Sequence, residues 1–150
     1  MNQSRILALD LGKKRIGLAL SDELGITARP LETLERANRR DDMRRLREVV
    51  REHHVSRIIV GHPLHLDGKV GEMAEEAARF AGRLRKEVSL EVELVDERLT
   101  TWEAEQTVLE TRQSSRRRNK PVDDMAAAVL LREYLERKRE HGPAKPPESE

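Results

Sequence analysis

The sequence predicts one α/β domain whose mixed sheet has three antiparallel and two parallel strands, flanked by helices. Two short apolar runs near the N-terminus are separated by only a few residues, which requires a hairpin. Farther along, short apolar strands alternate with longer segments of helical period, the pattern of strands joined by right-handed crossovers. The length of 150 residues is the common size of a single domain.

The first third of the chain predicts a three-stranded meander. The apolar run at 6–10 (ILALD) is typical of a buried strand that carries Asp10 to one edge of the sheet. A turn at 12–14 leads into a second strand at 15–21 (RIGLALS), and a third strand is expected at about 27–34.

Helices and the two remaining strands follow. An amphipathic helix is expected at 41–54, where the apolar residues share one face and arginines cover the rest. Such an arginine-rich face is most often simply exposed to solvent. The later elements are expected as a strand at 57–61, a turn-rich loop at 62–68, a helix at 72–87, a strand at 90–95, a helix at 101–112, a mobile basic loop at 113–121 and a helix at 122–139. We therefore predict a domain at 1–139 and a disordered, proline-rich tail at 140–150.

Composition excludes several classes of protein. The absence of cysteine rules out disulfides and thiolate metal sites, so a metal must be held by Asp, Glu or His. No run of about 18 apolar residues and no secretion signal are visible, which favours a cytoplasmic protein. A net charge of +1 and an aromatic content of 2% argue against a charge-driven nucleic-acid coat and against base-stacking modules.

Three carboxylates are candidates for a shared metal site. Asp10 ends the first strand, Glu97 follows the last strand, and Asp123 lies in the first turn of the final helix. If the first and last strands are neighbours, Asp10 and Glu97 lie at adjacent strand ends, and a helix across the sheet can bring Asp123 to both. Such a cluster suits hard divalent ions, and two ions can activate a water and stabilise the leaving oxygen of a phosphodiester. Each acid alone is more typical of a turn or helix cap than of a metal ligand.

Four segments, taken together and in order, carry a resemblance to a known family; they are LALDLG (7–12) with RIG (15–17), VGHPL (60–64) with DG (67–68), VDERLTT (95–101) and VDDMAA (122–127). With them the chain resembles the YqgF family, also called RuvX, of small bacterial nucleases in the RNase H-like superfamily, over nearly all of 4–138. The resemblance implies an RNase H-like sheet, trimming of the 5′ end of the 16S ribosomal RNA precursor, and kinship with the junction resolvase RuvC. It also implies that Asp10, Glu97 and Asp123 are the catalytic acids that bind Mg²⁺ or Mn²⁺, with a two-metal site expected.

Neighbouring residues leave alternatives open. Asp124 points about 100° away from Asp123 on a helix, and we favour Asp123. Strand alternation sends Asp96 and Glu97 to opposite faces, so one of them is structural. His62 and His65 depart from the apolar residue and asparagine expected in the family loop; His65 contacts a phosphate or is merely solvated.

Cations near the acids are candidates for substrate binding. Arg98 either clamps a phosphate or forms a local salt bridge. Lys13 and Lys14 lie in the hairpin beside Asp10, where they either bind the nucleic-acid backbone or only keep the protein surface soluble. The basic block before Asp123 is the stronger candidate for tracking a phosphate backbone, and it comprises Arg116, Arg117, Arg118 and Lys120.

Rival functions remain. The pattern from Asp10 to Gly17 also resembles the first phosphate motif of actin-like kinases, but the chain is too short for their two domains. A non-catalytic RNA-binding factor is a third class. Among nucleases, processing of precursor ribosomal RNA is the first choice, with single-stranded RNA as partner, and Holliday junction resolution of branched DNA is the alternative. The oligomeric state, monomer or homodimer, stays open.

Overall fold

The computed structural model describes residues 5–62, 71–96 and 123–141. Six strands and three helices lie in this part of the chain: β1 (Arg5–Leu11), β2 (Arg15–Ser21), β3 (Ala28–Pro30), β4 (Leu34–Glu35), α1 (Arg39–His53), β5 (Val55–His62), α2 (Glu72–Val88), β6 (Glu91–Asp96) and α4 (Asp123–His141). The expected helix at 101–112, the basic loop at 113–121 and the end of the tail at 142–150 lie outside the described residues. Among the described residues, no helix is both long and apolar enough to cross a lipid bilayer.

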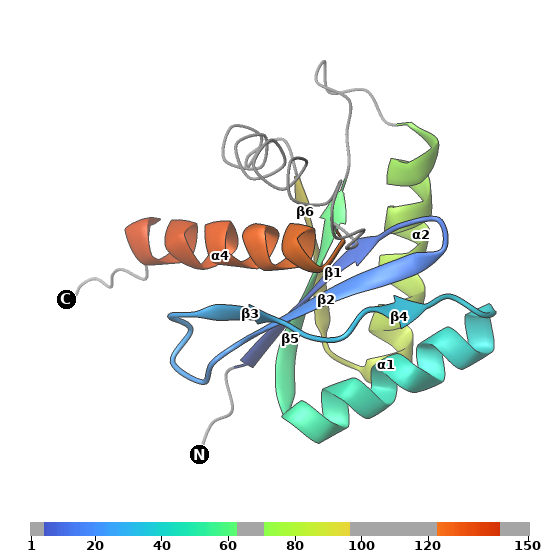
Figure 1. The fold of residues 1–150 in the computed structure, drawn as a ribbon, viewed down its shortest axis with the longest axis horizontal. Coiled ribbons are helices and arrows are strands. Elements are labelled where there is room, and N and C mark those ends of the chain that lie inside the picture. Colours follow the sequence, from blue (N-terminus) through green and yellow to red (C-terminus); the bar gives the residue numbers. More distant parts are fainter. Residues whose placement is uncertain (1–4, 63–70, 97–122, 142–150) are drawn as a thin grey trace, which may run out of the picture.

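One mixed sheet organises the domain (Figure 1). Its strands lie in the order β3-β2-β1-β5-β6, with β4 paired to β2 beside β3. β1 is antiparallel to β2 and parallel to β5, and β6 is parallel to β5. The predicted combination of an antiparallel meander with two parallel strands is confirmed.

The third strand differs from its predicted form. A single strand was expected at about 27–34, but the structure has two short pieces, β3 and β4, that both pair with β2. Pro30 ends β3, and a proline has no backbone N–H to continue the ladder. The chain therefore leaves β2 briefly and returns to it at Leu34.

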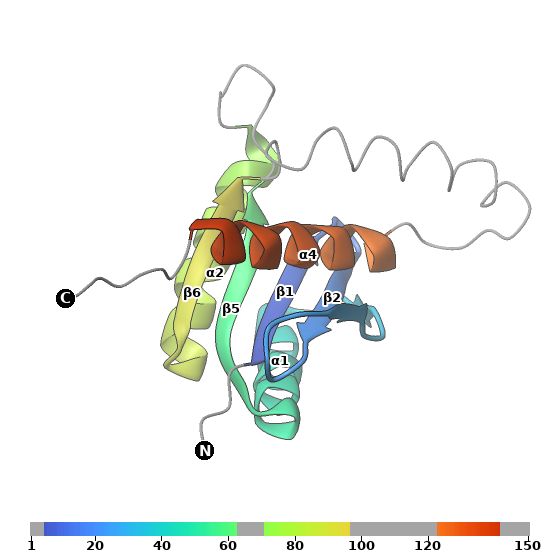
Figure 2. The same cartoon turned by 90° about the vertical axis from the view of Figure 1, so that its left-hand side faces the viewer.

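Two separate apolar cores cover the two faces of the sheet. Leu7 and Leu9 of β1 belong to the core with α1 and α2, whereas Ala8, between them, belongs to the core with α4. Figure 2 shows α4 lying across one face while α1 and α2 lie behind the other. Successive side chains of a strand point to opposite faces, so the parity of a residue number decides which core it joins.

Capping residues define the ends of the first two helices. The side chain of Asn38 accepts a hydrogen bond from the backbone N–H of Asp41, which starts α1 two residues before its predicted position. His54 and Ser89 adopt left-handed conformations directly after α1 and α2. Each turns the chain back toward the sheet, where β5 and β6 begin.

Asp42 is a buried carboxylate that ties the start of α1 to the segment before it. The residue is 3% exposed. Its Oδ1 accepts hydrogen bonds from the backbone N–H of Ala37 at 3.0 Å and from the guanidinium of Arg45 at 2.9 Å. The burial is tolerated because these donors replace water around the charge.

Replacing this carboxylate is expected to destabilise the domain. Asp42→Ala removes the acceptor of the Ala37 N–H and one of the two acceptors of the Arg45 guanidinium, the other being the carbonyl of Glu35. The substitution should lower the free energy of unfolding by about 2 kcal/mol. Urea unfolding measures the change. The control, Glu48→Ala, removes an exposed acid 3.8 Å from Arg44 on the same helix and should cost less than about 0.5 kcal/mol. Equal losses in the two variants would contradict the role given to Asp42.

A polar cluster holds the second half of α4 against the parallel strands. The hydroxyl of Tyr134 donates a hydrogen bond to Glu93 Oε1 at 2.9 Å, and Arg57 lies 3.1 Å from the same carboxylate. Burial, followed by the hydrogen bond to Glu93, raises the pKa of Tyr134 above its ordinary value of 10.0.

Alkaline titration tests this cluster directly, since Tyr134 is the one tyrosine of the chain. Followed by ultraviolet absorbance, the phenol should ionise with a midpoint above 10.0. Because the folded-state pKa is raised, the stability it contributes is complete below the unfolded value and is lost as pH rises through the folded value. Glu93→Gln should lower the midpoint only in part, since burial is the larger cause. A wild-type midpoint at or below 10.0 would disprove the assignment.

Candidate functional site

Asp10 is the predicted site residue whose surroundings the structure describes most fully. It is the penultimate residue of β1 and is half-buried. Its parity is that of Ile6 and Ala8, which pack in the core beneath α4. The carboxylate therefore lies on the α4 face, at the edge where β1 ends.

Glycines occupy the positions beside Asp10 on both neighbouring strands. Gly17 of β2 is its partner in the antiparallel register. On the other side, Leu9 pairs with Val60, and the next residue of β5 is Gly61. Gly61 follows Ile59 of the α4 core by two residues, so it lies on the same face as Asp10. Neither flanking strand contributes a side chain at the level of the carboxylate.

The end of β6 is not adjacent to the end of β1. The sequence raised the possibility that the first and last strands are neighbours, and this was wrong because β5 lies between them. The ends of β1 and β6 are therefore two strand spacings apart, about 10 Å. Side chains at the end of β1 and after the end of β6 can approach one another on the α4 face by extending over Gly61 of β5.

Asp96 and His62 lie on the opposite face from Asp10. They are partners in the parallel register of β5 and β6. Both have the parity of residues that pack with α1 and α2, such as Val60 and Val92. Asp96 thus lies on the opposite face of the sheet from Asp10, and the roles of Asp96 and Glu97 remain predictions.

The start of α4 is the third element of the predicted site. α4 begins at Asp123 and packs on β1, β2, β3 and β5. Ala127, one turn after Asp123, is fully buried in the same core as Ala8 and Ala19. In Figure 1 the orange, N-terminal end of α4 lies near the arrowhead of β1.

Several predicted site residues lie outside the described residues; they are Glu97, Arg98, Arg116, Arg117, Arg118, Lys120 and His65. No group of three metal-ligating side chains occurs within the described residues. Of the three predicted acids, only the side chain of Asp10 belongs to that part of the chain. Convergence of Asp10, Glu97 and Asp123 therefore remains a prediction.

The hairpin between β1 and β2 presents Lys13 and Lys14 to solvent. Both are exposed, three and four residues after Asp10. Gly12 allows the tight turn, because its N–H donates to the carbonyl of Arg15 at 2.8 Å and a Cβ on Gly12 would stand 3.0 Å from that oxygen. The hairpin thus holds two lysines near the end of β1.

Arg36 fixes this hairpin from the other side of the sheet, and the sequence reading missed it. Its guanidinium donates to the carbonyl of Gly12 at 2.7 Å and to Glu76 of α2 at 2.8 Å. It also lies over the ring of Phe80, 5.8 Å from the centroid. These partners are 24 to 44 residues away along the chain, so no local pattern could have identified the role.

Comparison with known sequences assigns the family. The family described as "RuvX: Holliday junction resolvase" matches residues 4–137. The chain belongs to the RuvX family. A relative from Geobacillus kaustophilus is 47% identical over 137 residues, covering 90% of this chain and 99% of its own. One from Symbiobacterium thermophilum is 46% identical over 145 residues, covering 97% and 98%. Both are named "Putative pre-16S rRNA nuclease".

Membership in the RuvX family confirms the resemblance found in the sequence and the nuclease class of enzyme predicted from it. Solved structures agree on the fold. RuvC of Thermus thermophilus in complex with a Holliday junction substrate superposes with a TM-score of 0.55 at 16% identity, covering 91% of this chain and 96% of that one. The Holliday junction resolvase of fowlpox virus gives a TM-score of 0.51 at 15% identity, covering 89% and 99%. At these identities the likeness establishes the RNase H-like fold alone.

Proposed function

We propose that this chain is a divalent-metal-dependent nuclease that hydrolyses phosphodiester bonds during 5′-end maturation of the 16S ribosomal RNA precursor. The observation that carries the proposal is the position of Asp10, on the α4 face at the carboxyl end of the central strand, in a chain 46–47% identical to relatives named for that reaction. The expected partner is single-stranded precursor RNA, and the expected location is the cytoplasm.

Asp10, Glu97 and Asp123 are the residues that would hold Mg²⁺ or Mn²⁺. Carboxylate oxygens are the ligands these hard ions prefer, and Asp10 meets the requirement for a half-buried carboxylate at a sheet edge. Bound there, the metal would lower the pKa of a water and stabilise the leaving oxygen of the phosphodiester.

The packing of the described residues supports this choice of acids. Asp96 lies on the far face, which supports the choice of Glu97, the next residue, as the acid that follows β6. Ala127 shares a core with Ala8, two residues before Asp10, and Asp123 precedes Ala127 by one helical turn. Glycines, the smallest residues, occupy the strand positions on either side of Asp10, Gly17 on β2 and Gly61 on β5.

Cations around the acids would orient the phosphate backbone. Lys13 and Lys14 are exposed beside the end of β1, which suits contact with phosphates flanking the cut. The other residues proposed for this role are Arg98, Arg116, Arg117, Arg118 and Lys120. Such contacts position a strand without reading its bases.

Holliday junction resolution is the second candidate, favoured by the description of the family that matches residues 4–137. A four-way junction requires two coordinated cuts, which calls for a homodimer. Maturation of a precursor RNA end requires only one site and can be carried out by a monomer. The substrate therefore distinguishes the two functions, and the oligomeric state follows from it.

Cleavage with and without Asp10 tests the proposal. Wild-type protein with Mn²⁺ or Mg²⁺ should cut labelled single-stranded RNA that carries the precursor 5′ sequence, and Asp10→Asn should cut about a thousandfold more slowly because one charged ligand is lost. The matched control is Asp96→Asn, which removes an acid at the same sheet edge on the opposite face and should retain most of the activity. Circular dichroism verifies that both variants fold.

The preferred substrate and the Asp96→Asn control determine whether the proposal stands. Symmetric cuts in a synthetic four-way junction, with RNA left intact, would replace RNA maturation by junction resolution. Equal loss of activity in Asp10→Asn and Asp96→Asn would refute the site built around Asp10. No cleavage of any of these substrates with either metal would refute a free-standing nuclease.

A further inference from the structure

A basic furrow runs between α1 and α2, on the face of the sheet opposite Asp10. Two adjoining cavities form it, of about 500 and about 490 Å³. Arg39 and Arg83 line both cavities, so the two cavities adjoin. We call this feature the α1–α2 furrow; its cations are Lys13, Lys14, Arg36, Arg39, Arg40, Arg44, Arg47 and Arg83.

The acids that line the furrow are already paired. Glu35 faces Arg15, Asp42 binds Arg45 and the Ala37 N–H, and Glu87 contacts Arg47. In contrast, five of the cations take part in no ion pair within the described residues; they are Lys13, Lys14, Arg39, Arg40 and Arg83. The furrow thus carries an excess of positive charge although the net charge of the chain is only +1.

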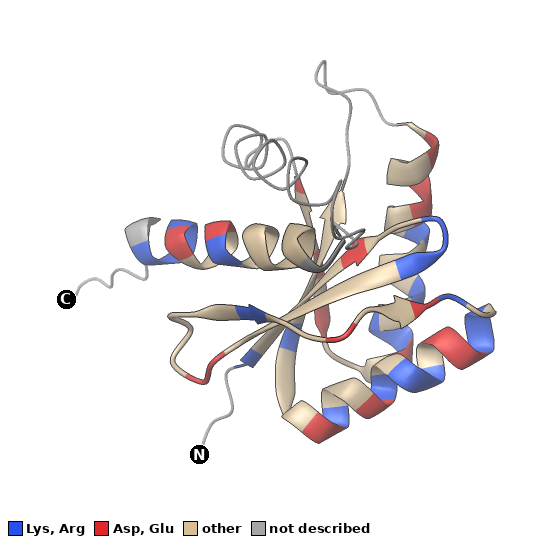
Figure 3. Ribbon diagram, viewed as in Figure 1, with Lys and Arg blue, Asp and Glu red and all other residues tan. Residues whose placement is uncertain are grey.

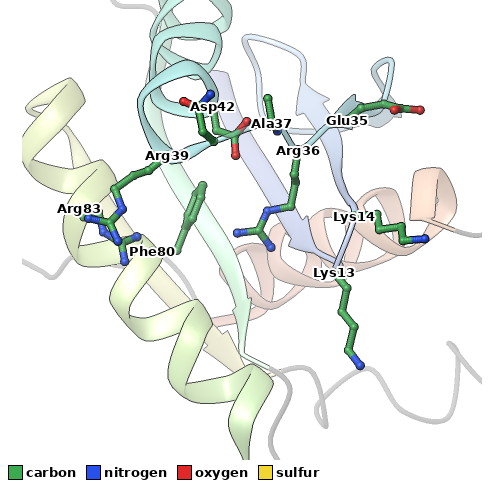
Figure 4. A pocket seen from close by; sticks show the side chains of 10 residues that line it. Lys13, Lys14, Glu35, Arg36, Ala37, Arg39, Asp42, Phe80 and Arg83 are labelled. Carbon is green, nitrogen blue, oxygen red and sulfur yellow. Dashed lines mark hydrogen bonds between the residues drawn. The ribbon is translucent and has the colours of Figure 1, made fainter.

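Arginines are crowded at the point where the two cavities meet. Burial is the largest cause that lowers the pKa of Arg83, followed by the guanidinium groups of Arg39 and Arg79. Figure 4 shows Arg39 and Arg83 together on one side of the cavity, with Lys13 and Lys14 on the other. An anion between these groups would relieve their mutual repulsion.

Specific contacts hold the floor of the furrow in place. Arg36 is held by Gly12 and Glu76 and lies over Phe80, which is 2% exposed. A ring so deeply buried cannot stack on a base. The furrow therefore suits a ligand recognised by its negative charges alone.

The length and position of the furrow suit an extended polyanion. Arg39 and Arg47 are eight residues apart on α1, about 12 Å, which is enough for more than one phosphate. One end of the furrow is formed by Lys13 and Lys14, in the hairpin that follows Asp10. Figure 3 shows Lys and Arg on α1, on the facing stretch of α2 and at this hairpin.

We propose that the α1–α2 furrow binds the phosphodiester backbone of single-stranded RNA, as a site separate from the acids on the α4 face. The proposal rests on the proposed function in taking RNA as the ligand, and it extends that function by adding a second contact outside the cleavage site. A strand that crosses the hairpin would engage both faces of the sheet. Because only charge is recognised, binding through the furrow should be independent of sequence.

Binding of RNA without cleavage tests this site. The probe is a fluorescent oligouridine of about 30 nucleotides, measured by anisotropy over a series of salt concentrations in EDTA so that no metal-dependent cleavage occurs. Arg39→Gln/Arg83→Gln should weaken binding about tenfold. The slope of log K against log salt should fall by about 1.4, since each phosphate contact on a single strand contributes about 0.7.

The matched control removes two exposed arginines elsewhere on the protein, Arg29 of β3 and Arg139 of α4, neither of which lines the furrow. Arg29→Gln/Arg139→Gln has the same net charge as the furrow variant and should keep wild-type affinity and salt slope. Thermal unfolding of both variants verifies that the fold is retained. Equal weakening by the two variants would overturn the proposal, because only overall charge would then matter.

A cleavage measurement with a short RNA separates this proposal from the nuclease proposal. The maximal rate of cleavage of an RNA of about 6 nucleotides, saturating the enzyme, should be the same in wild type and furrow variant. Unchanged affinity for the long RNA in the furrow variant would overturn the furrow site while leaving the nuclease intact. Loss of affinity in a protein that cleaves nothing would support the furrow and refute the nuclease.

Binding of fluorescent polyglutamate tests whether the ligand is instead an acidic protein. If the furrow variant loses polyglutamate binding while its RNA binding is unchanged, the furrow binds an acidic protein and the RNA proposal is overturned.

Discussion

The alternation of side chains along β1 is the constraint on which the rest of the structure depends. β1 is bordered by β2 and β5, and both of its faces are covered by helices. Leu7, Leu9 and Leu11 belong to the core with α1 and α2, while Ala8 belongs to the core with α4. A shift of register by one residue would exchange the two sets and turn Asp10 into the leucine core. The apolar burial that stabilises the sheet therefore also fixes the face of the candidate site.

The two faces of the sheet differ in the size of their residues as well as in their helices. Leucine, isoleucine and phenylalanine fill the core under α1 and α2, whereas Ala8, Ala19 and Ala127 line much of the core under α4. Small residues allow a helix to approach a sheet closely. α4 can therefore cross β1 and β2 closely, and glycines occupy the strand positions on either side of Asp10.

Charge is distributed unevenly although the chain is nearly neutral. Most acids of α1 and α2 form ion pairs that offset arginines locally, such as Glu76 with Arg36 and Glu87 with Arg47. Three cations without an ion pair among the described residues, Arg39, Arg40 and Arg83, line the furrow between the two helices, where the guanidinium of Arg39 acts on that of Arg83. A protein of net charge +1 can thus present a strongly positive surface to a polyanion.

The sequence by itself determined the class of fold, most element boundaries, the family and the position of Asp10 at a strand end, because periodicity and motifs are local properties of the chain. It did not determine that β5 separates β1 from β6, since strand order depends on long-range pairing. The sequence also predicted that the arginines of α1 form a solvated face, because their closeness to Arg83 arises only when α1 and α2 pack together. The hydrogen bonds from Arg36 to Gly12 and Glu76 could not be predicted from the sequence either, because they join residues far apart in the chain. Local pattern decides what each element is, and tertiary packing decides which charges meet.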